Sequence, residues 1–137
     1  MSLTILTTAI YGKAAGTAFE TAINGRLFEE VIPDNTEYPC CVYSIVSDTP
    51  EYPGGHTLED ITIQFSIYSS SGSASEVKDI LTKLRTVYDD CSLTLSDESL
   101  VYFIREGFNS MIETIETPEG NITLRHYAQD YNIMTSN

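Results

Sequence analysis

Residues 59–69 alternate strictly between apolar and polar side chains, and no other pattern in the chain fixes its local structure as firmly. The apolar set is Ile61, Ile63, Phe65 and Ile67. A period of two is typical of a strand with one buried face, and half-buried strands belong to antiparallel sheets. We therefore predict such a strand over residues 59–69, ended by the serine-rich run that follows.

Residues 73–88 change to the period of an α-helix. Their apolar stripe consists of Val77, Ile80, Leu81, Leu84 and Tyr88. Ser73 and Glu76 have the spacing of a capping box, in which each side chain satisfies the other residue's free backbone N–H. Two aspartates at 89–90 would oppose the helix dipole, so the helix should end near them. The segment predicts one long amphipathic helix.

The N-terminal quarter also has helical spacing. Residues 3–11 predict a helix capped by Ser2, and residues 17–24 predict a second short helix. Gly25 then occupies a left-handed cap position. One bent helix over both segments is the alternative.

A strand over residues 41–47 should follow Pro39, because proline cannot donate a hydrogen bond within a sheet and belongs at the start of a strand. Neighbouring side chains of a strand point to opposite faces, so Cys41 is expected toward the core and Cys40 away from it. The connection over residues 48–57 contains two prolines and two glycines and is predicted to be irregular and exposed. It presents Tyr52, an aromatic side chain between two prolines.

The C-terminal part returns to extended patterns. Residues 93–95 predict a short strand, and residues 100–105 and 110–117 predict extended segments with a bulge or bend at Gly107. A turn at 117–120 leads to the last strand, 121–134. We predict an α+β fold: a mainly antiparallel sheet of four to five strands, with an N-terminal helix and one long amphipathic helix on one face.

Size and charge limit the possible functions. A chain of 137 residues is expected to form one domain, residues 1–137. Seven basic residues against 20 acidic ones give a net charge of −13. Such a surface repels phosphate backbones and anionic membranes, so direct nucleic-acid binding and membrane binding are not expected. The remaining interpretations are solubility, a basic partner, divalent ions, or a channel wall that DNA passes without specific binding.

No residue set points to catalysis, and no cofactor or metal is expected. His56 and His126 lack the spacing of metal ligands, and Cys91 follows two aspartates, which disfavour a thiolate. The three cysteines form neither a disulfide framework nor a zinc motif. With no secretory signal or long apolar run, a cytoplasmic, reducing origin is expected.

The chain resembles the tail-completion, or tail-terminator, proteins of long-tailed bacteriophages and prophages. The resemblance follows the N-terminal helix and the segments Gly25–Phe28, Tyr38–Tyr43, Ile63–Ser69, Ser73–Tyr88 and His126–Ile133. It implies a non-enzymatic protein that closes an oligomeric ring, expected to be a hexamer, on the tail tube. The ring would end tail growth and join the tail to the head.

The resemblance further implies contacts with other copies, with the tail tube protein and with head–tail connector proteins. Ring closure requires loops or edge strands that pair between subunits. The proline-rich loop and the last strand are the candidates, with Tyr52, Pro53, His56 and Tyr131 as contact residues. The expected location is the virion tail, with assembly in the host cytoplasm. The alternatives are another head–tail connector or minor tail component, and an acidic DNA mimic that inhibits a nucleic-acid enzyme.

Overall fold

A five-stranded sheet in the order β1-β2-β3-β5-β4 forms the frame of the protein. The computed structural model describes residues 2–137. The strands are β1 (Leu27–Glu29), β2 (Cys40–Glu51), β3 (Leu58–Ser69), β4 (Ser99–Thr117) and β5 (Gly120–Ser136). Only the short β1 runs parallel to its neighbour, β2, and all other pairs are antiparallel. The predicted α+β class and the mainly antiparallel sheet are confirmed.

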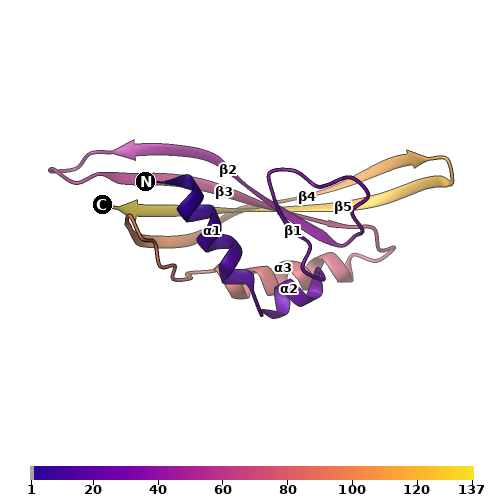
Figure 1. Ribbon diagram of the computed structural model, residues 1–137. Helices are drawn as coiled ribbons and strands as arrows, with labels where there is room; N and C mark the ends of the chain where they lie inside the picture. The colour runs from indigo at the N-terminus through magenta and orange to yellow at the C-terminus, as the bar shows by residue number, and fades with distance from the viewer. Residues whose placement is uncertain (1) are drawn as a thin grey trace.

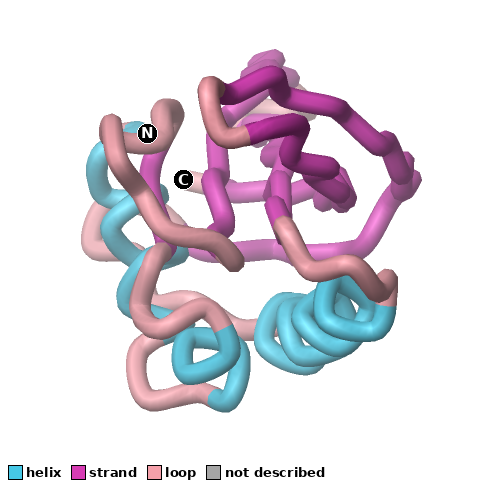
Figure 2. Tube along the Cα trace, turned by 90° about the vertical axis from the view of Figure 1, so that its right-hand side faces the viewer, coloured by secondary structure: helices cyan, strands magenta, loops and turns pink. Residues whose placement is uncertain are grey.

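Three helices gather on one side of the twisted sheet (Figures 1 and 2). They are α1 (Leu3–Ala14), α2 (Ala18–Ala22) and α3 (Ser75–Tyr88). Separate N-caps show that α1 and α2 are two helices and not one bent helix: the hydroxyls of Ser2 and Thr17 accept from the N–H groups of Ile5 and Glu20. Gly25, with φ of 72°, takes the predicted left-handed conformation beyond α2.

The core lies between the helices and the apolar face of the sheet. Ile61, Ile63, Phe65 and Ile67 of β3 are all fully buried there, which confirms the predicted alternation. Their aromatic centre is Phe65, whose ring lies 4.5 Å from Tyr88 and 5.8 Å from Tyr131. The stripe of α3 packs onto this centre, and its Tyr88 hydroxyl donates to the Ile10 carbonyl of α1 at 2.7 Å.

The start of α3 differs from the prediction. The helix begins at Ser75, its N-cap Ala74 makes no side-chain capping bond, and the capping box of Ser73 and Glu76 does not form. The Glu76 carboxylate instead accepts a 2.7 Å hydrogen bond from the hydroxyl of Ser69, the buried last residue of β3. This bond connects the end of the strand to the first turn of the helix, and the spacing of known capping motifs does not reveal it.

Two further predictions, one of a loop and one of a strand, also need correction. The connection predicted over residues 48–57 is shorter, because β2 continues to Glu51 and pairs there with Leu58. Residues 93–95 form no strand. Leu93 and Leu95 are half-buried and pack against the core from an irregular connection. Pairing across the hairpin decides the first case, and packing against the core decides the second.

Candidate assembly surfaces

The sheet carries two hairpins that end on opposite sides of the molecule (Figure 1). One is the β2–β3 tip, residues 52–57. The other is the arm, which we define as residues 113–124 of β4 and β5. Pairing between β3 and β5 ends at Ser69 and Arg125, so the two strands of the arm pair only with each other. An isolated two-stranded hairpin is marginally stable in water. The arm therefore lacks the third strand that would support it within the sheet.

Apolar side chains are exposed on and beside the arm. They are Met111, Ile112, Ile115 and Ile122. The arm also carries three acidic residues and no lysine or arginine; the acids are Glu113, Glu116 and Glu119. Ile115 and Ile122 are paired across the two strands, and exposed apolar side chains bordered by charge are typical of a protein interaction surface.

The outer edge of β4 is a second exposed feature. In the sheet order β4 is the last strand, so along its 19 residues it pairs only with β5. Val101 and Ile104 on this strand are 55% and 43% exposed. An edge strand with free backbone donors and acceptors and exposed apolar side chains can pair with another chain.

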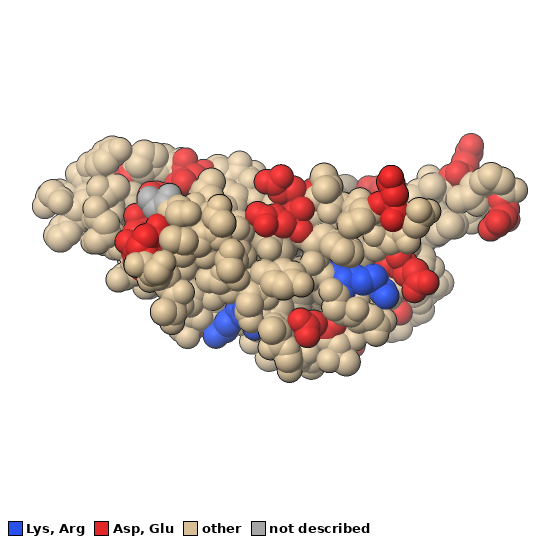
Figure 3. All heavy atoms as spheres, in the orientation of Figure 1, with Lys and Arg blue, Asp and Glu red and all other residues tan. Residues whose placement is uncertain are grey.

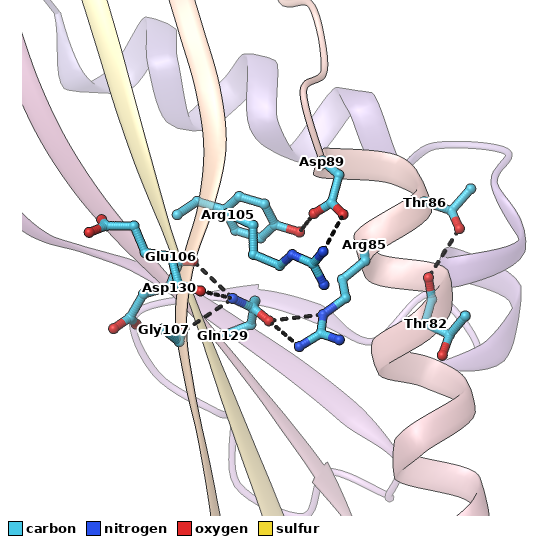
Figure 4. A network of polar contacts seen from close by, with 10 residues as sticks. Thr82, Arg85, Thr86, Asp89, Arg105, Glu106, Gly107, Gln129 and Asp130 are labelled. Carbon is cyan, nitrogen blue, oxygen red and sulfur yellow. Dashed lines mark hydrogen bonds and ion pairs between the residues drawn. The ribbon is translucent and has the colours of Figure 1, made fainter.

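The direction of the arm is set at its base by a β-bulge. The register between β4 and β5 shifts between Arg105 and Phe108, which confirms the irregularity predicted at Gly107. The Gln129 side chain, fully buried, donates from Nε2 to the carbonyls of Glu106 and Gly107, each at 3.2 Å. A carbonyl released from the strand ladder needs another donor, and the buried Gln129 side chain supplies it (Figure 4).

Helix α3 holds this glutamine from the other side. Arg85 donates from Nε and Nη2 to Oε1 of Gln129 at 3.0 and 2.8 Å, and its guanidinium lies 5.6 Å from the centre of the Phe108 ring. One turn later Asp89 accepts from the Tyr131 hydroxyl at 2.7 Å and pairs with Arg105 at 3.6 Å. Burial, together with the Asp89 hydrogen bond, raises the pKa of Tyr131. The network thus fixes the base of the arm to the helix layer.

On the helix-free face, His126 of β5 stacks on Tyr68 of β3 with ring centres 4.3 Å apart. Its Nδ1 lies 3.7 Å from the carboxylate of Glu113 on the arm. Burial lowers the pKa of His126, although the Glu113 charge opposes this shift. The residue is 9% exposed, and within residues 2–137 neither ring nitrogen has a hydrogen-bond partner.

The predicted contact residues fall into two groups. Tyr52, Pro53 and His56 lie at the β2–β3 tip, where all three are exposed and Tyr52 reaches 74%. Tyr131 is fully buried among the core aromatics, so it belongs to the core and is not available to a partner. The last strand is likewise wrong as a pairing edge, because β5 lies between β3 and β4.

The environments of the three cysteines disfavour the reactive thiolate form. Cys40 and Cys41 are both fully buried, on opposite faces of β2 as predicted, and Cys91 is half-buried. Burial raises the pKa of Cys40 and of Cys91 to about 11. Within residues 2–137 no group of three His, Cys, Asp or Glu side chains is placed to hold a metal ion, and no helix has the length and apolar character to cross a membrane.

The sequence predicted the hairpin around residues 117–120, and the structure confirms it. It did not predict that this hairpin extends beyond β3, nor its anchor. Neither Arg85 nor Gln129 belongs to a recognisable motif. The one available signal was the predicted bulge at Gly107, since the carbonyls of a bulge lose their strand partners and need other donors.

Comparison with known proteins gives the family. A family model described as tail completion protein gp17 matches residues 5–136. Among solved structures, a chain from the virion of a native gene transfer agent (GTA) particle is similar with a TM-score of 0.71, over 96% of this chain and 95% of that chain. The two are 10% identical, so this likeness shows a common fold only. No match was found among curated proteins.

The family match covers nearly the whole chain and confirms the resemblance seen in the sequence. The chain belongs to the tail completion protein gp17 family and is a structural component of phage-type tails.

Proposed function

We propose that the protein closes an oligomeric ring, with a hexamer as the expected size, on the end of the tail tube. The ring terminates tail growth and joins the tail to the head. The observation that carries the proposal is the arm. It is an acidic, partly apolar hairpin that pairs with no third strand, and Arg85 and Gln129 hold its base in a fixed direction. A projecting element that docks on a different surface of the next copy makes a head-to-tail contact, and such contacts form a ring when the rotation from copy to copy closes.

The β2–β3 tip is the proposed contact with the tail tube protein or with head–tail connector proteins. Tyr52 is 74% exposed, and Pro53 and His56 lie beside it at the same end of the molecule. Aromatic side chains on a rigid protrusion are typical anchors at protein interfaces. The tip and the arm project from opposite ends of the sheet (Figure 1), which leaves the tip free when the arm contacts a neighbouring subunit.

Charge supports a passage for DNA without specific binding. The face shown in Figure 3 carries several separate groups of acidic side chains and few lysines or arginines. Asp60 and Asp130 lie on the helix-free face of the sheet, where they accept hydrogen bonds from Asn132 and Gln64. A negative wall repels the DNA backbone and does not retain it. Neutralising these acids should slow genome passage, and unchanged DNA ejection would count against this assignment.

The test is direct observation of assembly. The purified protein is imaged by negative-stain microscopy and measured by light scattering, at high concentration, with and without magnesium, and again after incubation with isolated tail tubes. The net charge of −13 opposes self-association, so divalent ions should promote it. Rings with a central hole, free or on tube ends, are expected.

Other outcomes would point elsewhere. Binding to the portal side of heads but not to tube ends would indicate a different head–tail connector. A monomer that ignores tube ends and binds a basic nucleic-acid enzyme with strong salt dependence would indicate an acidic inhibitor.

A further inference from the structure

The arm of one copy needs a receiving surface on the next, and the helix layer offers one. A groove with a volume of about 670 Å³ lies where α1 and α3 end and α2 begins. We call it the helix groove and define it by Lys13, Phe19, Lys83, Val87, Asp89, Asp90 and Cys91. A volume of several hundred Å³ can accept the two-residue turn of a hairpin.

We propose that the tip of the arm, residues 116–120, docks into the helix groove of a second copy of this chain. The inference rests on the proposed ring and identifies the contact that builds it. Two surfaces of one chain that complement each other form a head-to-tail contact, which can propagate around a ring.

Charge complementarity selects this groove. The tip presents Glu116 and Glu119 next to Ile115 and Ile122. The groove presents the ammonium groups of Lys13 and Lys83 beside the apolar side chain of Val87. Asp89 and Asp90 also line it, and Arg105 pairs with Asp89. Lys13 and Lys83 are two of the seven basic residues of the chain, and they are the groups that a glutamate of the tip would meet.

The charges already in the groove permit this contact. Lys83 pairs with Asp79 at 2.8 Å in an exposed i,i+4 arrangement, which contributes little and can be exchanged. No ion pair within residues 2–137 involves Lys13. Asp89 is bound by Tyr131 and Arg105, so a docked tip must face the lysines and leave Asp90 in solvent.

The contact must form between copies. Figure 1 shows the arm projecting at one end of the molecule, whereas α2 and the adjoining ends of α1 and α3 lie well away from its tip. The anchor of Gln129 and Arg85 fixes the base of the arm, so the arm cannot fold back onto its own groove.

Covalent trapping tests the contact. Cys91 lines the groove, and the other two cysteines are fully buried. Under copper-phenanthroline oxidation, Glu119→Cys should therefore crosslink to Cys91 of the next copy and give a ladder of species larger than dimers. In a Cys91→Ser background only tip-to-tip dimers should remain. Glu51→Cys, at the end of the other hairpin, is the matched control and should give no ladder.

Charge reversal tests the complementarity independently. Lys13→Glu/Lys83→Glu and Glu116→Lys/Glu119→Lys should each raise the concentration needed for assembly by about tenfold or more. An equal mixture of the two variants should assemble again, because each arm then meets a groove of opposite charge. Lys78→Glu, on α3 outside the groove, is the control and should behave as the parent chain does. Circular dichroism and thermal melts confirm that each variant is folded.

The outcomes separate this contact from the ring itself. Rings without the crosslinked ladder overturn the docking of the arm and leave the proposed function standing. A ladder without rings supports the docking and overturns the ring. Failure of the mixed variants to reassemble, while each remains folded, also overturns the docking.

Discussion

Arg85 of α3 donates two hydrogen bonds, of 3.0 and 2.8 Å, to the amide oxygen of Gln129 on β5. The amide nitrogen of the same glutamine donates to the two carbonyls of the bulge in β4. One side chain therefore connects the helix layer, the central sheet and the base of the arm. Because its amide is held from both sides, the arm leaves the body of the protein in a defined direction.

Replacing Gln129 with leucine should destabilise the protein by roughly 1–3 kcal/mol, since two bulge carbonyls and the half-buried Arg85 guanidinium lose their partner. Chemical denaturation measures the effect, and faster hydrogen exchange in the arm should accompany it. Gln64→Leu is the matched control. Gln64 makes one hydrogen bond, to Asp130, and is only half-buried. Equal losses for the two variants would show that the bulge does not depend on Gln129.

Tyr88→Phe should cost about 0.5–1.5 kcal/mol of unfolding free energy. The substitution keeps the ring against Phe65 and removes only the hydroxyl that donates to Ile10 of α1. Urea titration gives the value. Tyr11→Phe is the control, because Tyr11 is 49% exposed and surface changes of this kind stay within about 0.5 kcal/mol. A neutral Tyr88→Phe would mean that the α1–α3 contact is held by packing alone.

Stability should fall on acidification through His126. Its pKa in the folded state lies below the ordinary value of 6.5, mainly because of burial and despite the nearby Glu113 carboxylate. The unfolded chain therefore binds more protons as the pH drops from 6.5 toward the lower folded pKa, and stability is lost over that window. Above pH 6.5 this residue contributes no pH dependence.

The measurement is the thermal midpoint between pH 5 and 8 for the parent chain and for His126→Phe, which can keep the stack on Tyr68. The variant should show a smaller loss on acidification. His56→Gln removes the other, exposed histidine and serves as the control. An unchanged profile in His126→Phe would assign the acid sensitivity to the carboxylates.

Tyr52→Ala should leave stability within about 0.5 kcal/mol of the parent chain, because the side chain is 74% exposed. If the β2–β3 tip contacts the tail tube, the variant should bind tube ends at least about tenfold more weakly, the loss expected for an aromatic anchor. Cosedimentation with isolated tail tubes measures this. Tyr11→Phe is again a suitable control, and undiminished binding by Tyr52→Ala would remove the tip from the tube contact.

Local patterns predicted most elements of the fold. The alternation of β3, the stripe of α3, the cap of α1 and the bulge near Gly107 are visible in the chain because each depends on neighbours within a few residues. The capping box failed where a local choice competed with a distant one. Ser69, seven residues before Glu76, took the carboxylate that local spacing had assigned to Ser73.

The acidic charge, the lack of catalytic spacing and the family resemblance were all present in the sequence itself. The position of each strand in the sheet was not. Tyr131 was predicted to contact a partner and lies in the core, because β5 became an inner strand and β4 took the exposed edge. The sequence alone predicted most of the strands and helices, since periodicity depends on residues close together in the chain. Only the tertiary structure decided which edge, hairpin and groove stay free, since strand order depends on pairing between distant segments.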